Sequence, residues 1–374
     1  WLSGKSEKST SNSRKPWLRT CNLRSIASYW KKRSGTHKTN ARERPSLITM
    51  EQIDLNTLDP SKTIVLDAHL LKSYRKCQKY FWWFEDQHVV GKQNSPAPAF
   101  GIAMHEGIEH FRRAKMQSLT FNDCYQQGAQ ALMTALKKHM PPEYLSPTMQ
   151  DDARAPKNAL RIFTGYCNHY EPANLKFHHV EVPFALYFGS FDYNGKTIDA
   201  IYTGIIDAVL EMHQRIYVND LKSTGWNINQ EWLDGFKMDQ GLLGYMVAAK
   251  HILGVDTNYA VIHGIWVKAE AKNPKYAKPI DEYFHTNELY WDETQIDEWS
   301  VNTLATACEI FIKQHDPAAH WQMSFGDACS QYSGCSYRPL CSLPPAARAQ
   351  RIAMDYEHAI WRPLEDERLQ KFTP

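Results

Sequence analysis

The chain has 374 residues, which is enough to bury one large hydrophobic core or two. No apolar run approaches the roughly 20 residues that a membrane span needs, so we expect a soluble protein. The net charge of +2 is unevenly distributed, because residues 1–49 hold 12 Lys and Arg against 2 acidic residues and the remainder carries −8. A basic body therefore gives no argument for nucleic-acid binding, and any such contact would have to use a local groove.

Residues 1–49 are rich in Ser, Lys, Arg and Thr, show little apolar periodicity and are expected to be disordered. The first methionine is Met50, and two interpretations stay open. Either Met50 is the native start, or the segment is a basic arm that contacts nucleic acid. We favour the first. We expect a single domain over residues 50–345, followed by a polar helical tail over residues 346–374.

The first element expected in this domain is a helix rich in aromatic residues at Asp67–Asp86, with Cys77 inside it. After a Pro-containing loop at Lys92–Ala99, the apolar spacing of Phe100–Met116 is typical of an amphipathic helix that carries His105. Further helices are expected at Phe121–Lys138, Ala155–His169, Trp232–Ile252 and Glu293–Gln314, and strands at His178–Phe188, Thr197–Glu211, Ile216–Ser223, Tyr259–Lys268 and Asp281–Tyr290. This order predicts an α/β fold in which helices flank a central mixed β-sheet.

The stretch Thr203–Gly225 predicts a β-hairpin, because two apolar runs with strand character flank a short polar break. We place the turn at His213 and Gln214. Asp207 then lies directly opposite Asp220, since both residues are equally far from the turn.

Two aspartates that face each other in an apolar strand pair repel one another and need a cation. Lys222 is one candidate, because strand side chains alternate between faces and place it on the face of Asp220. A divalent ion is another, since hard oxygen ligands suit Mg²⁺ or Mn²⁺. The alternative is a hairpin whose register is shifted by a bulge, with Lys222 paired to one aspartate.

The last three cysteines, Cys329, Cys335 and Cys341, are separated by five residues each. They lie in a Gly- and Pro-containing segment, residues 325–345, which we call the clasp. Thiols in such a segment make a poor core and are better suited to a metal or cluster site, with a fourth ligand from elsewhere, for which Cys77 is the obvious candidate. The spacing is not the C-x2-C pair of common zinc modules. The alternative is that these are reduced structural cysteines.

A set of ordered features resembles the PD-(D/E)xK nucleases, and most of all the RecB-like nuclease domain with an iron–sulfur clasp, as in CRISPR-associated Fe–S exonucleases and phage nucleases. The features are Cys77, Phe100-Gly-x3-His105, Gly204-x2-Asp207, Asp220-Leu-Lys222-Ser-Thr, Gln240 with Tyr245, and the cysteine triplet. The resemblance covers roughly Leu66–Leu343.

The resemblance implies a restriction-endonuclease-like core closed by the cysteine-rich clasp. It implies that His105, Asp207 and Asp220 bind Mg²⁺ or Mn²⁺, with the carbonyl of Leu221 as a further ligand. Lys222 would position or activate the attacking water.

The resemblance also implies that Gln240 and Tyr245 lie beside the site, and that Cys77, Cys329, Cys335 and Cys341 hold a [4Fe–4S] cluster. Two departures from the family pattern matter. The family glutamine stands four residues before its tyrosine, where this chain has Gly241, so Gln240 is rotated by about 100° and is expected to point away. The family's triplet often begins with C-x2-C, whereas the first gap here is five residues.

These features together predict a metal-dependent DNA nuclease, by resemblance an exonuclease in phage or bacterial recombination, repair or DNA end processing. It would act in the cytoplasm, with a helicase or recombinase as a partner, and would contact mainly phosphates. Trp82, Trp83 and Trp226 are candidates for stacking on single-stranded bases. Two alternatives stay open: a non-catalytic DNA- or protein-binding module that keeps the fold, and a zinc-stabilised structural protein.

Overall fold

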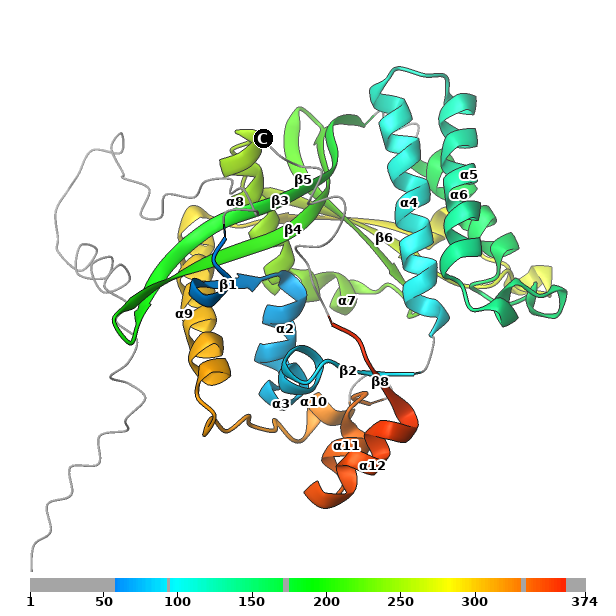
Figure 1. Ribbon diagram of the computed structural model, residues 1–374. Coiled ribbons are helices and arrows are strands. Elements are labelled where there is room, and N and C mark those ends of the chain that lie inside the picture. The colour runs from blue at the N-terminus through cyan, green and yellow to red at the C-terminus, as the bar shows by residue number, and fades with distance from the viewer. Residues whose placement is uncertain (1–57, 93–94, 171–174, 331–333, 361–374) are drawn as a thin grey trace, which may run out of the picture.

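A computed structural model describes residues 58–92, 95–170, 175–330 and 334–360 (Figure 1). The segment 1–49, which we expect to be disordered, lies outside these ranges. Among the described residues, none of the helices combines the length and the apolar character that a membrane span requires. The strands are β1 (Thr63–Leu66), β2 (Val89–Gly91), β3 (Lys176–Tyr193), β4 (Lys196–Met212), β5 (Arg215–Thr224), β6 (Tyr259–Trp266), β7 (Phe284–Tyr290) and β8 (Tyr356–His358).

The helices lie between these strands and after them. The α-helices are α2 (Ala68–Lys76), α3 (Gln78–Phe81), α4 (Pro96–Met116), α5 (Phe121–His139), α6 (Pro156–Tyr170), α7 (Gln230–Asp234), α8 (Gln240–Leu253), α9 (Glu293–His315), α10 (Asp327–Ser330), α11 (Arg338–Cys341) and α12 (Pro345–Asp355). A π-helical turn, η4 (Trp82–Asp86), follows α3, and a 3₁₀ turn, η7 (Gly235–Met238), follows α7.

The main sheet has the order β1-β4-β5-β6-β7, and β3 pairs with the other edge of β4. The β1–β4 and β5–β6 pairs are parallel, whereas β3–β4, β4–β5 and β6–β7 are antiparallel. The prediction of an α/β fold with a central mixed sheet is therefore confirmed. Helices cover both faces: α2, α8 and α9 share one hydrophobic core with the sheet, and α4, α5 and α6 share the other.

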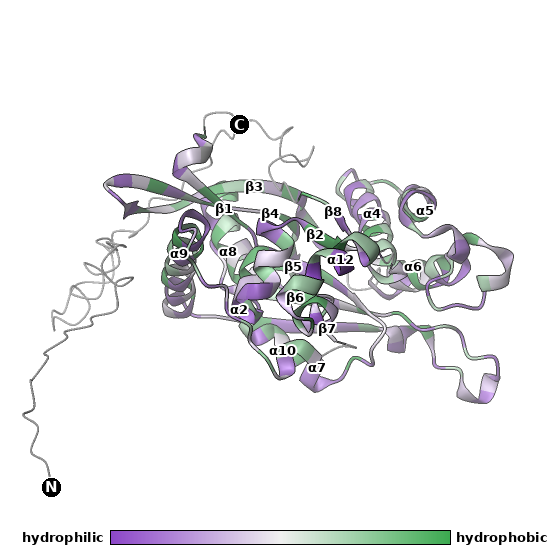
Figure 2. Ribbon diagram, turned by 60° about the horizontal axis from the view of Figure 1, so that its bottom comes forward, coloured by the Kyte–Doolittle hydropathy of each residue, from purple (hydrophilic) through white to green (hydrophobic). Residues whose placement is uncertain are grey.

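Apolar residues concentrate on the central strands and the inner sides of the helices (Figure 2). The same strands contribute different residues to the two cores. Val218 of β5 lies in the core of α8 and α9, whereas Leu221 lies in the core of α4, α5 and α6. A functional side chain on β5 can therefore face either helical layer, depending on its position.

Two predicted helices are in fact broken. The helix expected at Asp67–Asp86 is interrupted at Cys77, whose backbone is extended with φ −164° and ψ 115°. The helix expected at Trp232–Ile252 is divided into α7, η7 and α8. The division ends at Asp239, whose carboxylate accepts hydrogen bonds from the first backbone N–H groups of α8 and so starts a new helix there.

Two boundaries also differ from expectation. Helix α4 begins at Pro96, inside the predicted loop, because Ser95 caps it and proline is well tolerated in a first helical turn. The tail predicted to be helical contains β8 after α12, and β8 pairs antiparallel with β2, Val89 facing His358. Residues 361–374 of that tail lie outside the described ranges.

The clasp packs against the start of the domain, as Figure 1 shows at the lower end of the molecule. Trp83 and Val89 share a small core with Tyr337, Leu340 and Tyr356. The hydroxyl of Tyr337 donates a hydrogen bond to the Val89 carbonyl. Segments about 250 residues apart in the chain are thus held together beside Cys77.

Candidate active site

The centre of the site is a fork in the sheet. The predicted turn at His213 and Gln214 is confirmed, and both residues have positive φ, as the tight hairpin turns that match strand twist require. The β4–β5 pairs run from the turn to Ala208 opposite Asn219, and the next pair in this register is Asp207 with Asp220. Farther along, β4 has β1 as its neighbour while β5 stays with β6. The two aspartates therefore stand where the strands part.

The strict alternation of faces expected along β4 is wrong at this fork. Ile206 and Val209 lie in the same core although they are three residues apart, whereas regular strand geometry would put them on opposite faces. Asp207 lies within this interval. Across it on β3 is Glu181, bracketed by the pairs of Val180 and Val182, and its backbone is left-handed with φ +48°. The distortion falls where the candidate ligands are.

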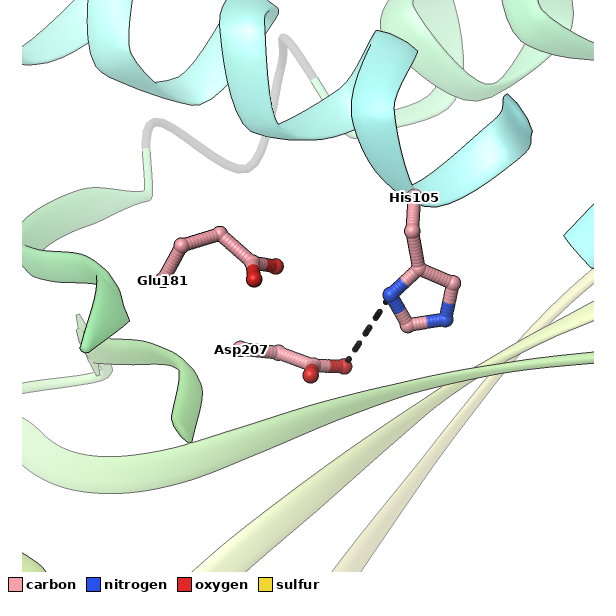
Figure 3. Close-up of side chains that lie close together, drawn as sticks. All are labelled: His105, Glu181 and Asp207. Carbon is pink, nitrogen blue, oxygen red and sulfur yellow. Dashed lines mark ion pairs between the residues drawn. The ribbon is translucent and has the colours of Figure 1, made fainter. Parts of the chain in front are cut away.

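His105 comes to the fork from α4. Its Nε2 lies 3.0 Å from the carbonyl oxygen of Leu221, and its Nδ1 lies 3.6 Å from Oδ2 of Asp207 (Figure 3). Burial lowers the pKa of His105, against the opposing effect of the Asp207 charge. The neutral ring has one N–H. When Nε2–H donates to Leu221, Nδ1 presents its lone pair toward Asp207.

Glu181 is the residue that sequence reasoning missed. Ligand atoms of His105, Glu181 and Asp207 all lie within 4.8 Å of one another, and Figure 3 shows the three side chains converging from α4, β3 and β4. Two carboxylates and an imidazole in one place form a donor set for a divalent ion. No motif marks Glu181, because only the pairing of β3 with β4 brings it to this place.

Asp220 and Lys222 form an ion pair on β5. The Lys222 Nζ lies 2.8 Å from Oδ1 and 2.6 Å from Oδ2 of Asp220, whose side chain is 3% exposed while that of Lys222 is 40% exposed. Burial raises the pKa of Asp220 to about 7, and the Asp207 charge acts in the same direction. Burial alone would lower the pKa of Lys222, but Asp220 and Asp207 outweigh it and raise that pKa. Lys222 is therefore a cation at neutral pH.

The raised pKa of Asp220 predicts how the stability of the metal-free protein depends on pH. Between about pH 4 and about pH 7 the folded chain keeps a proton that the unfolded chain has released, so stability falls as pH rises through this window, by at most about 1.4 kcal/mol per pH unit. We expect Asp220→Asn to flatten this decline in urea unfolding measured in EDTA. An unchanged pH dependence in the variant would contradict the assignment.

Tyr245 of α8 lies over the strand that carries Asp207. A Cβ atom added at Gly204 would stand 2.8 Å from the Phe184 ring and 3.3 Å from Tyr245, so glycine permits this close approach. Burial raises the pKa of Tyr245 well above its usual range, and the charges of Asp220 and Asp207 raise it further. Tyr245 thus stays a neutral hydroxyl beside the carboxylates.

Gln240 does not join them. Its side-chain amide donates to the carbonyl of Ala68, and its oxygen accepts from Arg75, both on α2. Both polar ends of the Gln240 side chain are thus bound by α2. This agrees with the expectation that Gln240, five residues before Tyr245, points away from the site. We therefore propose no catalytic role for Gln240.

A buried cation lies next to the site. Arg112 of α4 is 2% exposed and donates to the hydroxyl of Tyr166 and to Oδ1 of Asn219, at 2.8 and 2.7 Å. Its positive charge is one of the causes that lower the pKa of His105. Asn219 is therefore polar in an apolar strand because it binds Arg112, a reason that could not be deduced from the hairpin alone.

The four predicted cysteines gather at the clasp, and all are free thiols. Burial raises the pKa of Cys335, and Cys77 and Cys329 are close enough to raise it further. Burial also raises the pKa of Cys341, again with contributions from Cys335 and Cys77. The extended backbone at Cys77 that breaks the predicted helix lies at this cluster.

The spread of the sulfur atoms bears on what they could hold. In the described part of the chain, only His105, Glu181 and Asp207 bring three potential ligand atoms within 4.8 Å of one another. The thiolates of a tetrahedral zinc site stand roughly 4 Å apart. A [4Fe–4S] cluster also takes four thiolates, one on each iron, and holds them farther apart, so four cysteines are a donor set for either group.

Comparison with known proteins gives one informative match. The family model for the PD-(D/E)XK nuclease superfamily matches residues 68–342. No curated protein matches the chain. Among solved structures, the chain is similar to the one titled "Crystal structure of SSO0001", with 11% identity over 54% of this chain and 74% of that chain and a TM-score of 0.21.

Proposed function

The chain belongs to the PD-(D/E)XK nuclease superfamily, and from this premise we propose that it is a divalent-metal-dependent DNA nuclease. The observation that carries the proposal is the convergence of His105, Glu181, Asp207 and the Asp220–Lys222 pair at the fork between β4 and β5. A buried pair of opposed carboxylates is costly unless a cation joins it. The arrangement supports a site built for an ion and a phosphate.

The donor geometry suits Mg²⁺ or Mn²⁺. Adjacent ligands of an octahedral Mg²⁺ stand roughly 3 Å apart and opposite ones roughly 4 Å apart. The 3.6 Å between His105 Nδ1 and Asp207 Oδ2, and the 4.8 Å limit that includes Glu181, are close to this range. Asp220 would complete the set once it is deprotonated. The carbonyl of Leu221, expected as a ligand, accepts a hydrogen bond from His105, an orienting contact that metal-binding histidines commonly make.

The chemistry we propose is phosphodiester hydrolysis. A bound divalent ion supplies a nucleophilic water near neutral pH and neutralises phosphate charge. Lys222, held by Asp220, orients that water and stabilises the charge that develops on the phosphate oxygens. Leu221 N–H donates to Oδ2 of Asp207 at 2.8 Å and fixes that carboxylate. We propose that Tyr245, a neutral hydroxyl, donates to a phosphate oxygen.

We further propose an exonuclease that processes DNA ends in phage or bacterial recombination or repair, in the cytoplasm, with a helicase or recombinase as partner. The support is the resemblance to RecB-like nucleases with an iron–sulfur clasp. We assign the [4Fe–4S] cluster to Cys77, Cys329, Cys335 and Cys341, where it would tie the two ends of the domain together.

A non-catalytic binding module remains the second candidate, and cleavage separates the two. The purified chain is incubated with linear and with covalently closed circular DNA, in Mg²⁺, in Mn²⁺ and in EDTA. Metal-dependent loss of the linear DNA alone would support an exonuclease, and loss of both would support an endonuclease. Intact DNA in every metal, with the cluster verified as present, would favour the binding module.

Glu181 offers a prediction specific to this chain. Glu181→Gln removes one anionic ligand and is expected to weaken Mn²⁺ binding about 10- to 100-fold, with little effect on stability, because the side chain is only partly buried. Isothermal titration with Mn²⁺ measures this directly. The matched control is Glu109→Gln on α4, whose carboxylate pairs with Arg113. Equal Mn²⁺ affinity in the two variants would remove Glu181 from the site.

A further inference from the structure

A cavity of about 590 Å³ lies apart from the fork, and none of the residues proposed for catalysis lines it. Its volume is within the range of small-ligand sites, roughly 300–1,000 Å³. Three parts of the chain build it: the α3–η4 segment, the end of α9 with the connection that follows, and α12. The residues on which the argument depends are Lys79, Trp82, Lys313, Trp321, Phe325 and Arg348.

Two cations of this cavity have unused capacity to bind an anion. The Lys79 Nζ lies 3.1 Å above the Trp82 ring and has no carboxylate within ion-pair distance among the described residues. Arg348 donates its Nε to the carbonyls of Leu340 and Leu343, while its terminal Nη groups donate to no acceptor in the described ranges.

The carboxylates of the cavity are not paired with these two cations. Asp86 and Asp316 line the cavity, but among the described residues no ion pair joins either of them to Lys79 or Arg348, whereas Lys313 pairs with Glu309, which does not line the cavity. A phosphate between Lys79 and Arg348 would relieve the repulsion between them and would accept charge-assisted hydrogen bonds from both.

An exposed aromatic ring stands in the same cavity. Phe325 is 71% exposed, and its backbone is left-handed with φ +51°, a conformation that is costly for a bulky residue. The Phe325 ring packs in none of the three hydrophobic cores, so its placement adds nothing to their packing. A solvent-exposed ring beside phosphate-binding cations is the combination with which proteins hold single-stranded nucleic acid.

We propose that this cavity binds one nucleotide of a single DNA strand, with its phosphate on Lys79 and Arg348 and its base stacked on Phe325. The choice of polymer rests on the proposed nuclease function. A free nucleotide offers the same phosphate and base, so the test includes it as a separate ligand.

The test measures binding of a fluorescein-labelled oligo(dT) by anisotropy in EDTA, where a metal-dependent enzyme cannot cleave. Phe325→Ala is expected to weaken binding about 5- to 100-fold through the lost stacking. Lys79→Gln is expected to weaken binding and to reduce the slope of log K against log salt by about 0.7. Matched controls are Tyr276→Ala, an exposed aromatic residue elsewhere that is 68% exposed, and Lys138→Gln on the surface of α5; neither should change binding.

Three results would overturn the proposal: wild-type chain that does not bind oligo(dT), variants at Phe325 and Lys79 that bind like the wild type, or displacement of the oligonucleotide by thymidine monophosphate at equal concentration. The last would assign the cavity to a free nucleotide. Because the assay contains no metal, its outcome is independent of cleavage. If the wild-type chain cleaves DNA but Phe325→Ala binds oligo(dT) normally, only the cavity proposal is refuted. If the chain binds oligo(dT) through Phe325 but cleaves no DNA, only the nuclease proposal is refuted.

Discussion

Lys222→Met is expected to reduce DNA cleavage by about 10²- to 10³-fold or more while the chain still binds metal. The Lys222 ammonium is the only proposed group at the fork that brings a fixed positive charge to a phosphate without itself being a metal ligand. Methionine keeps much of the aliphatic length and removes the charge. Asp220 loses its ion-pair partner at 2.6 Å, so its pKa should rise further in the metal-free variant.

The measurement is the rate of DNA cleavage at saturating Mg²⁺, together with Mn²⁺ titration of the same preparations. Lys237→Met is a matched control, because Lys237 is exposed and pairs with Asp234 on a neighbouring turn. Loss of cleavage with metal binding retained would support a role for Lys222 in the chemical step. Cleavage within a few fold of the wild type would remove Lys222 from the site.

Cys335→Ala is expected to abolish the brown colour of the anaerobically purified chain and to destabilise it strongly. A cluster on Cys77 and the clasp joins residues about 250 positions apart. Cross-links that close loops this long remove unfolded-state entropy worth on the order of 5 kcal/mol. Loss of one of the four ligands should remove most of that stabilisation, because the free energy of metal binding is coupled to folding.

Visible absorbance, iron content and thermal unfolding of the variant check this expectation. Cys124→Ala is the control for a lost buried thiol, since Cys124 is a buried cysteine in α5, outside the clasp. Both variants delete a thiol, but only Cys335→Ala should lose iron. A colourless wild type prepared without oxygen, or zinc in place of iron, would contradict the cluster.

Local chemistry explains which parts of the site could be predicted from the sequence. The turn at His213 and Gln214 and the opposition of Asp207 to Asp220 depend on one hairpin, whose register follows from counting outward from the turn. The helix carrying His105 was recognisable from its apolar spacing. That helix starts earlier than its apolar spacing predicts, because Ser95 caps it and Pro96 fits its first turn.

What could not be predicted depends on contacts between distant segments. Glu181 reaches the fork only because β3 pairs with β4, and no local pattern gives that register. The same holds for Arg112, whose partners Tyr166 and Asn219 come from different elements. The predicted helices break at Cys77 and Asp239 because contacts with distant segments outweigh local helix propensity. Cys77 lies at the clasp, and Asp239 caps a helix packed on the sheet.

The most direct test of the central claim is cleavage of linear DNA in Mg²⁺ by Asp207→Asn beside Asp256→Asn. Asp207 lies at the centre of the proposed site: it shares a metal-ligand group with His105 and Glu181 and accepts the Leu221 N–H. Asp256 is an exposed aspartate paired with Lys250. We predict that Asp207→Asn folds but does not cleave, while Asp256→Asn cleaves at the wild-type rate. Equal cleavage by the two variants would contradict the assignment of the fork as the active site.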